Sequence, residues 1–298
     1  MSDNRVVGQL DFSGKWHIGV MLILLSAFLY SPVGMFSKGV DADSWSIIFW
    51  RGAIAVPAGI FYLMLTGKLG SEWCRLQRNA WFCLLVVALQ ACATAAFIAS
   101  FKLTSVANVA LIWGASPVIA AVIGWLLLLE RVTKRFLVAV VLVVAGNAVI
   151  VLGSASGQAG SGLSGDGLAL LMTILLVSST IVYRYCPDMP STLPTVAATL
   201  ALMPVAPLLS SPFTIPLDEI LISALGGITF VMACITLIEG AKYLAPGETA
   251  LLCITEIPWA IILAILVLAE YPSSQAMIGG AVIMTAVMWY QWRAFRSA

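Results

Sequence analysis

The sequence repeats a set of residues at an offset of 140 positions, and this repeat limits the fold more than any single motif does. Both copies carry a lysine, an Ala-Leu pair, a proline and a closing glutamate in the same order. The pairs are Lys102 and Lys242, Ala110 and Ala250, Leu111 and Leu251, Pro117 and Pro258, and Glu130 and Glu270, with the prolines one position out of register. Two half-chains with matching proline-interrupted segments predict two related structural units.

The composition predicts an integral membrane protein. Of the 298 residues, 61% are hydrophobic and 10% are charged, whereas soluble domains carry roughly 25% charged residues. Apolar segments of about 20 residues span a hydrocarbon core of about 30 Å. About ten such segments occur, at 18–37, 45–66, 81–101, 106–129, 135–153, 167–185, 193–210, 219–239, 248–269 and 276–292. The formal net charge of +1 provides no basic field for a nucleic acid.

Lysine and arginine are distributed unequally between the two sides of the predicted spans. If the amino terminus is cytoplasmic, twelve basic residues lie on the cytoplasmic side: Arg5, Lys15, Lys68, Arg75, Arg78, Arg131, Lys134, Arg135, Arg184, Lys242, Arg293 and Arg296. The opposite side holds Lys38 and Lys102. Because cytoplasmic loops carry the excess of basic residues, both termini are predicted to be cytoplasmic. Each half then contains five spans, an odd number, so the second half must be inverted relative to the first.

These observations predict an all-α integral membrane protein of about ten transmembrane helices, arranged as two inverted five-helix repeats. The first repeat is expected at 1–153, a linker at 154–166 and the second, inverted repeat at 167–298. Glycine and serine fill the linker, which predicts a flexible connection between the halves.

The residues that carry the repeat resemble those of a known family. In each half a basic residue closes the first helix, and a later apolar run ends in glutamate. The matching residues are Lys38, Arg51, Ser116, Pro117 and Glu130 in the first half and Arg184, Glu256 and Glu270 in the second. The pattern is similar to EamA-type exporters of the drug/metabolite transporter superfamily, and most of all to the aromatic amino-acid exporters. Where such exporters have a Glu-Pro pair, Ile257 here separates Glu256 from Pro258.

Glu256 lies eight residues into its predicted helix, near the middle of the membrane. An ionised carboxylate there costs ~2.5–3.5 kcal/mol, so it faces a cavity, finds a partner or stays protonated. We predict that it binds a substrate ammonium group or exchanges a proton. The alternative is a neutral or paired glutamate that stabilises the helix break at Pro258. Trp259 lies three positions on and is expected to share the face of Glu256.

Arg51 is the other charge well inside a predicted span. Its planar guanidinium suits carboxylates, so one interpretation is that it binds a substrate carboxylate. The favoured interpretation is a structural charge that pairs with a carboxylate or with backbone carbonyls, because its position in the family resembled above implies a supporting role.

Polar and aromatic side chains recur at helical spacing on several other predicted helices. With Glu256 they give the predicted substrate-binding residues: Tyr30, Gln90, Thr94, Phe97, Trp113, Ser116, Thr229, Glu256 and Trp259. The aromatic members suit a ligand with an apolar ring. The alternative for the serines and threonines is ordinary hydrogen bonding between helices, worth only ~0.6 kcal/mol on average.

Three prolines and two glutamates are predicted to shape the helices. Pro32, Pro117 and Pro258 are expected to interrupt their helices and to free carbonyl groups that a cavity can use; simple packing is the alternative. Glu130 and Glu270 lie at helix C-termini, where a negative charge opposes the helix dipole. Each is therefore expected to contact a neighbouring loop or helix terminus and to be architectural.

Together these features predict a secondary transporter of the bacterial inner membrane. It is expected to export small organic metabolites by alternating access, with aromatic or apolar amino acids favoured and with other metabolites or drugs as the alternative. No phosphate-binding loop, metal-ligand spacing or disulfide pattern occurs, so no cofactor, metal or obligate protein partner is predicted. An intramembrane enzyme is disfavoured because His17 is the only histidine, and a receptor-like scaffold would not need an inverted repeat.

Overall fold

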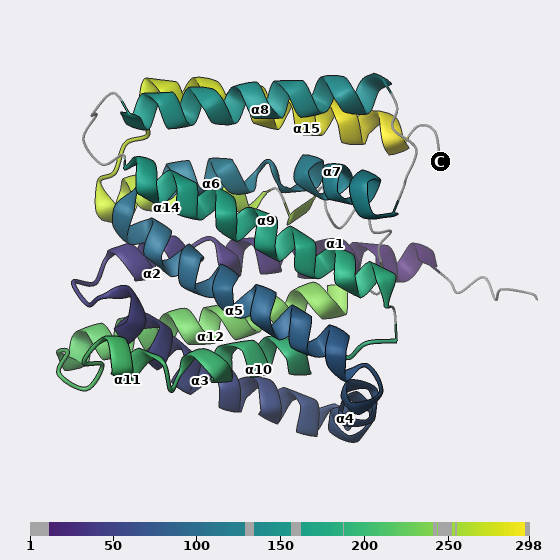
Figure 1. The fold of residues 1–298 in the computed structure, drawn as a ribbon, viewed down its shortest axis with the longest axis vertical. Coiled ribbons are helices and arrows are strands. Elements are labelled where there is room, and N and C mark those ends of the chain that lie inside the picture. The colour runs from purple at the N-terminus through teal and green to yellow at the C-terminus, as the bar shows by residue number, and fades with distance from the viewer. Residues whose placement is uncertain are drawn as a thin grey trace, which may run out of the picture.

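The computed structural model describes residues 12–128, 134–155, 162–186, 188–240, 243, 252–253 and 255–295. Of the residues that define the repeat, Glu130, Lys242, Ala250 and Leu251 lie outside this part of the chain. The described part contains helices and no strand (Figure 1). The helices are α1 (Phe12–Tyr30), α2 (Val33–Lys38), α3 (Ser44–Leu65), α4 (Leu69–Arg78), α5 (Ala80–Leu103), α6 (Val106–Trp113), α7 (Ser116–Leu128), α8 (Lys134–Ala155), α9 (Leu163–Tyr185), α10 (Leu193–Leu202), α11 (Ala206–Leu209), α12 (Leu217–Gly240), α14 (Glu256–Leu268) and α15 (Ser274–Phe295).

The chain is a membrane protein with several apolar helices. Within the described residues, five segments are long and apolar enough to cross a membrane: His17–Lys38, Ser44–Leu65, Ala80–Leu103, Leu163–Tyr183 and Leu217–Leu237. Shorter apolar helices lie at Leu137–Ile150, Leu193–Leu209, Glu256–Leu268 and Ser274–Ala286. Every apolar segment predicted from the sequence overlaps one helix or a pair of consecutive helices.

The predicted helix breaks at prolines are found at two positions. Pro32 lies between α1 and α2, and Pro117 lies in the first turn of α7 after a break from α6. Pro258 lies in the first turn of α14. Backbone N–H groups in the first turn of a helix form no hydrogen bond within the helix. Proline, which lacks an N–H, can therefore begin a helix without losing a hydrogen bond. Pro57, by contrast, lies inside α3, which continues past it.

Helices that are far apart in the sequence pack side by side. α5 packs on α9 and α10, α12 packs on α1 and α3, and α8 lies along α15 (Figure 1). α6 also packs on α14, and α3 on α10. Matching the helices of the two halves in order pairs α1–α2 with α9, α3 with α10–α11, α5 with α12, α6–α7 with α14 and α8 with α15. Exchanging each helix for its counterpart maps the contacts of α5 with α9 and α10 onto those of α12 with α1 and α3. The contacts of α8 with α15, of α6 with α14 and of α3 with α10 map onto themselves.

The predicted linker at 154–166 is largely helical in its described part. α8 extends to Ala155 and α9 begins at Leu163, four residues before the predicted start of the second half. A Cβ on Gly165 would lie 2.7 Å from the carbonyl carbon of Leu103. Glycine is therefore needed here because it lets α9 approach the end of α5. The interpretation of these glycines as a flexible linker is wrong for residues 162–166.

One helix, α4, was not predicted from the sequence. Its Glu72 is buried and accepts hydrogen bonds from the backbone N–H groups of Thr192 and Leu193 and from the Ser191 hydroxyl. A carboxylate is favourable at the positive end of a helix dipole. Glu72 therefore anchors the start of α10.

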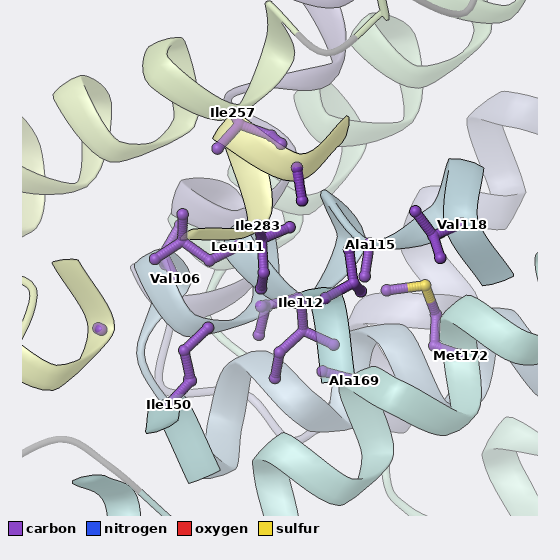
Figure 2. Close-up of a cluster of buried hydrophobic side chains, with 14 of the residues drawn as sticks. Val106, Leu111, Ile112, Ala115, Val118, Ile150, Ala169, Met172, Ile257 and Ile283 are labelled. Atoms are coloured by element: carbon purple, nitrogen blue, oxygen red, sulfur yellow. The ribbon is translucent and has the colours of Figure 1, made fainter. Parts of the chain in front are cut away.

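The largest buried apolar cluster surrounds α6. Figure 2 shows Leu111 and Ile112 of α6 among Ile257, Ile283 and Met172, which come from α14, α15 and α9. Burial of these side chains fixes the rotation of α6 about its axis. The remaining face of α6 is thereby turned toward a cavity.

Candidate functional site

A small cavity lies between α1, α2, α5, α6 and α14. Its lining is mainly apolar and aromatic: Tyr30, Ser31, Gly34, Phe97, Phe101, Val106, Val109, Ala110, Trp113, Glu256, Ile257 and Ala260. Glu256 is the only carboxylate in this lining, and the lining contains no lysine or arginine among the described residues. The cavity therefore combines one acid with an apolar wall.

Glu256 is held at the start of α14. It is the first residue of that helix, where the helix dipole favours a negative charge. The indole N–H of Trp113 is the hydrogen-bond donor that faces its carboxyl group, and the Ser31 hydroxyl donates to its backbone carbonyl at 3.3 Å. No lysine or arginine of the described chain forms an ion pair with Glu256. The carboxyl group is thus positioned but left available to bind a cation or a proton.

Aromatic rings form one wall of the cavity. The rings of Phe97 and Phe101, one turn apart on α5, meet edge to face with centroids 4.7 Å apart. Edge-to-face packing stabilises such pairs. Trp113 of α6 adds a third ring close to Glu256. This wall suits an apolar or aromatic portion of a ligand.

A polar cluster lies beside the cavity at Tyr30. The Tyr30 hydroxyl and the Cys234 sulfur are hydrogen-bonded at 2.9 Å, and the Tyr30 ring contacts the edge of Phe230 at 5.9 Å. The guanidinium of Arg51 lies over the same Phe230 ring, 4.1 Å from the ring centroid. Tyr30 thus joins the cavity to a buried arginine.

Next to the cavity, α2 and α14 end and α6 begins, a region called here the Lys38 end of the bundle. Lys38 and Glu270 form an ion pair at 2.9 Å, and Lys38 also donates to the Thr104 carbonyl at 2.9 Å. The backbone N–H of Val106, a lining residue, donates to Glu270 at 3.2 Å. The prediction that Glu270 contacts a neighbouring helix terminus is confirmed; the matching prediction for Glu130 lies outside the described residues.

The first half of the chain matches a known family. Residues 17–152, which include most of α1, all of α2 to α7 and most of α8, match the EamA-like transporter family. Four of the helices that line the cavity, α1, α2, α5 and α6, lie within this EamA segment. The family implies a membrane transporter of the drug/metabolite superfamily.

Comparison of structures extends the likeness beyond the EamA segment. A solved crystal structure is similar to this chain, with a TM-score of 0.65 and 18% sequence identity. The similarity covers 94% of this chain and 98% of the chain in that structure. At this identity the likeness shows a shared fold over nearly the whole chain, including α9 to α15. No curated protein sequence matches the chain.

Four of the predicted site residues meet at the cavity. Tyr30, Phe97, Trp113 and Glu256 come from α1, α5, α6 and α14 and line the same space. The other five predicted residues lie outside its lining: Gln90, Thr94, Ser116, Thr229 and Trp259. Thr229 instead donates to the Gly226 carbonyl of its own helix, as expected for the alternative interpretation of such residues.

Trp259 does not share the cavity face of Glu256. It is 43% exposed, and its ring contacts Phe28 of α1 at 5.5 Å. Residues of a helix are about 100° apart, so the cavity-facing arc of α14 runs from Glu256 through Ala260 to Ile257. Trp259 lies about 60° outside that arc on the far side of Glu256.

Arg51 does not form the carboxylate pairing predicted for a structural charge. It is buried, forms no ion pair within the described residues, and its Nη1 atom has no hydrogen-bond partner there. The reason is the close approach of α12, which brings Phe230 beneath the guanidinium.

Several cavity residues were missed because they are apolar, among them Val106, Val109 and Ala110 of α6. Together with Trp113, which was predicted, they follow the spacing i, i+3, i+4, i+7 and form one stripe of α6. That spacing is a detectable signal, but in the sequence it is identical to the stripe of any buried helix.

Proposed function

We propose that the protein is a secondary transporter that exports small organic metabolites by alternating access, with aromatic or apolar amino acids as the favoured substrates. One observation carries the proposal: the Glu256 carboxyl group lines the same cavity as Phe97, Phe101 and Trp113. A substrate ammonium group pairs with Glu256, while its ring or apolar side chain packs on the aromatic wall.

Two observations support transport between two related half-bundles. Residues 17–152 match a transporter family, and the main helix contacts are preserved when each half is exchanged for the other. We propose that the halves are inverted five-helix repeats that rock against each other around the cavity. The site would then lie in a bacterial inner membrane, with both termini in the cytoplasm.

Counterflow in proteoliposomes tests this function. Liposomes with purified protein and loaded with unlabelled phenylalanine are diluted into labelled phenylalanine. The proposal predicts a transient accumulation of label above that in protein-free liposomes. A panel of aromatic, apolar and polar amino acids then ranks the substrates. Absence of counterflow for the whole panel, with correctly folded protein, would contradict the proposal.

A second candidate is an exporter of organic cations. It is favoured by the lining itself, which has a carboxylate and no basic residue among the described residues. An apolar amine would satisfy Glu256 and the aromatic wall without needing a partner for a carboxylate. Inhibition of phenylalanine counterflow by matched amines distinguishes the two candidates.

A further inference from the structure

Arg51 is a buried charge for which the described part of the structure provides no counter-charge. Its exposed fraction is 6%, and it lies in the middle of α3, a helix long and apolar enough to cross a membrane. Its Nη1 atom is buried without a hydrogen-bond partner within the described residues. A buried charge without a partner is costly, and charges kept inside membrane proteins usually mark substrate or ion sites.

The backbone around Arg51 is fixed by close helix packing. A Cβ on Gly227 of α12 would lie 2.6 Å from the carbonyl oxygen of Arg51, so the two backbones are in direct contact there. This approach places Phe230 of α12 under the guanidinium at 4.1 Å. Stacking of this kind covers a face of the guanidinium and leaves its in-plane N–H donors free for a planar acceptor.

Tyr30 lies between Arg51 and the cavity. It lines the cavity together with Glu256, and its ring contacts Phe230, the ring over which the Arg51 guanidinium lies. The hydroxyl is hydrogen-bonded to the Cys234 thiol, which is a weak partner. A stronger acceptor entering from the cavity can therefore displace this bond at little cost.

From this arrangement we infer that Arg51 binds the carboxylate of the transported molecule, so that the substrate is a zwitterion held between Glu256 and Arg51. The inference rests on the proposed function and selects within it. A carboxylate displaces the Tyr30 hydroxyl from Cys234 and accepts from the guanidinium edge, while the ammonium group pairs with Glu256. Binding of an amine alone would leave Arg51 without a counter-charge and would place a second positive charge near it.

Three matched probes test this inference: phenylalanine, phenethylamine, which lacks the carboxylate, and 3-phenylpropionate, which lacks the amine. Each is tested as an inhibitor of phenylalanine counterflow by wild-type protein and by the variants Arg51→Gln and Arg75→Gln. Arg75 is an exposed arginine of α4 and is the matched control. Folded protein in each preparation is quantified by size-exclusion chromatography.

Wild-type protein is expected to bind phenylalanine at least roughly tenfold more tightly than either analogue, because each analogue loses one charged hydrogen-bond partner. Arg51→Gln should lower the affinity for phenylalanine by roughly tenfold or more, while the affinity for phenethylamine stays within about twofold of the wild-type value. Arg75→Gln should retain the wild-type ratio. The wild-type comparison stands by itself if Arg51→Gln does not fold.

Failure of the inference differs from failure of the proposed function. If wild-type protein transports phenylalanine but binds phenethylamine equally well, or if Arg51→Gln weakens both probes equally, the inference is overturned and the transport function stands. If wild-type protein transports none of the amino-acid panel, the proposed function itself fails.

Discussion

Charged residues in two regions of this molecule are handled in opposite ways. At the Lys38 end of the bundle, Lys38 and Glu270 pair at 2.9 Å, and Glu270 also accepts from the backbone of Val106. Beside the cavity, Glu256 and Arg51 form no ion pair within the described chain. Both regions lie between helices of the two halves, so the difference does not come from topology.

The difference separates charges that hold helices from charges that await a ligand. A paired charge satisfies itself and stabilises the contact between α2, α6 and α14. An unpaired charge in an apolar interior is costly and is retained where something binds it. Under the proposed function, the Lys38 end is architectural and the cavity binds the substrate.

The largest expected effect concerns which side of the membrane the Lys38 end faces. Ser164 at the start of α9 and Ser71 in α4 are exposed positions on opposite sides of the predicted topology. Each is changed to cysteine in a background without native cysteines, and intact cells are labelled with a membrane-impermeant maleimide. Ser164→Cys should be labelled from outside, and Ser71→Cys only after lysis. Labelling of both from the same side would contradict the inverted repeats.

Glu256→Gln is expected to cause the largest loss of transport. The change keeps size and hydrogen bonding but removes the charge, so phenylalanine counterflow should fall roughly ten- to a hundredfold. In wild-type protein, lowering the pH protonates Glu256 and weakens ammonium binding, so the counterflow rate should decrease as the pH is lowered. In the variant the counterflow rate should not depend on pH. If Glu256 exchanges a proton without gripping the ammonium, the variant keeps exchange and loses only the pH dependence of net flux. A wild-type rate and pH profile would show that Glu256 is structural.

Trp113→Ala is expected to have a smaller effect than Glu256→Gln. It should reduce the transport of ring-bearing substrates by about two- to tenfold, because aromatic contacts are worth ~0.5–1.5 kcal/mol beyond their buried area. Threonine, which has no ring, should lose less. Trp259→Ala tests the same comparison from outside the cavity and is expected to show no selectivity for rings. Equal losses across all substrates for Trp113→Ala would show that the Trp113 side chain only packs between helices and does not contact the substrate ring.

The smallest expected effect is the coupling energy of the paired charges. A double-mutant cycle with Lys38→Met and Glu270→Gln, followed by thermal unfolding in detergent, should give about 1 kcal/mol, because both side chains are mostly buried. The Lys68–Glu239 pair is longer, at 3.5 Å, and more exposed, so the same cycle there should give no more than about 0.3 kcal/mol. A larger coupling at Lys68–Glu239 would contradict the ranking.

The sequence predicted those parts of the structure that follow from composition and from strong local signals. The apolar segments, the helix breaks at Pro32 and Pro117 and the contact of Glu270 with a helix terminus all rest on such signals. Glu256 could be predicted to line a cavity because a lone acid inside an apolar helix has few stable environments.

The rotation of each helix about its axis was not predictable in the same way. A membrane helix is apolar on all sides, so it lacks the amphipathic pattern that sets rotation in a soluble protein. On α12 the functional neighbours are Phe230 and Cys234, not Thr229, and on α14 the cavity side passes through Ala260, not Trp259. Each error is a rotation of about 100° to 140°, which only the contacts between helices can fix.

Direct binding of phenylalanine to the purified protein tests most directly the claim that the unpaired charges bind substrate. Isothermal titration of wild-type protein is compared with Glu256→Gln and Arg51→Gln on one side and Lys38→Met on the other. The account predicts that both cavity variants lose affinity by roughly tenfold or more, while Lys38→Met stays within about threefold. Equal affinities in all four proteins, or a larger loss in Lys38→Met than in the cavity variants, would contradict it.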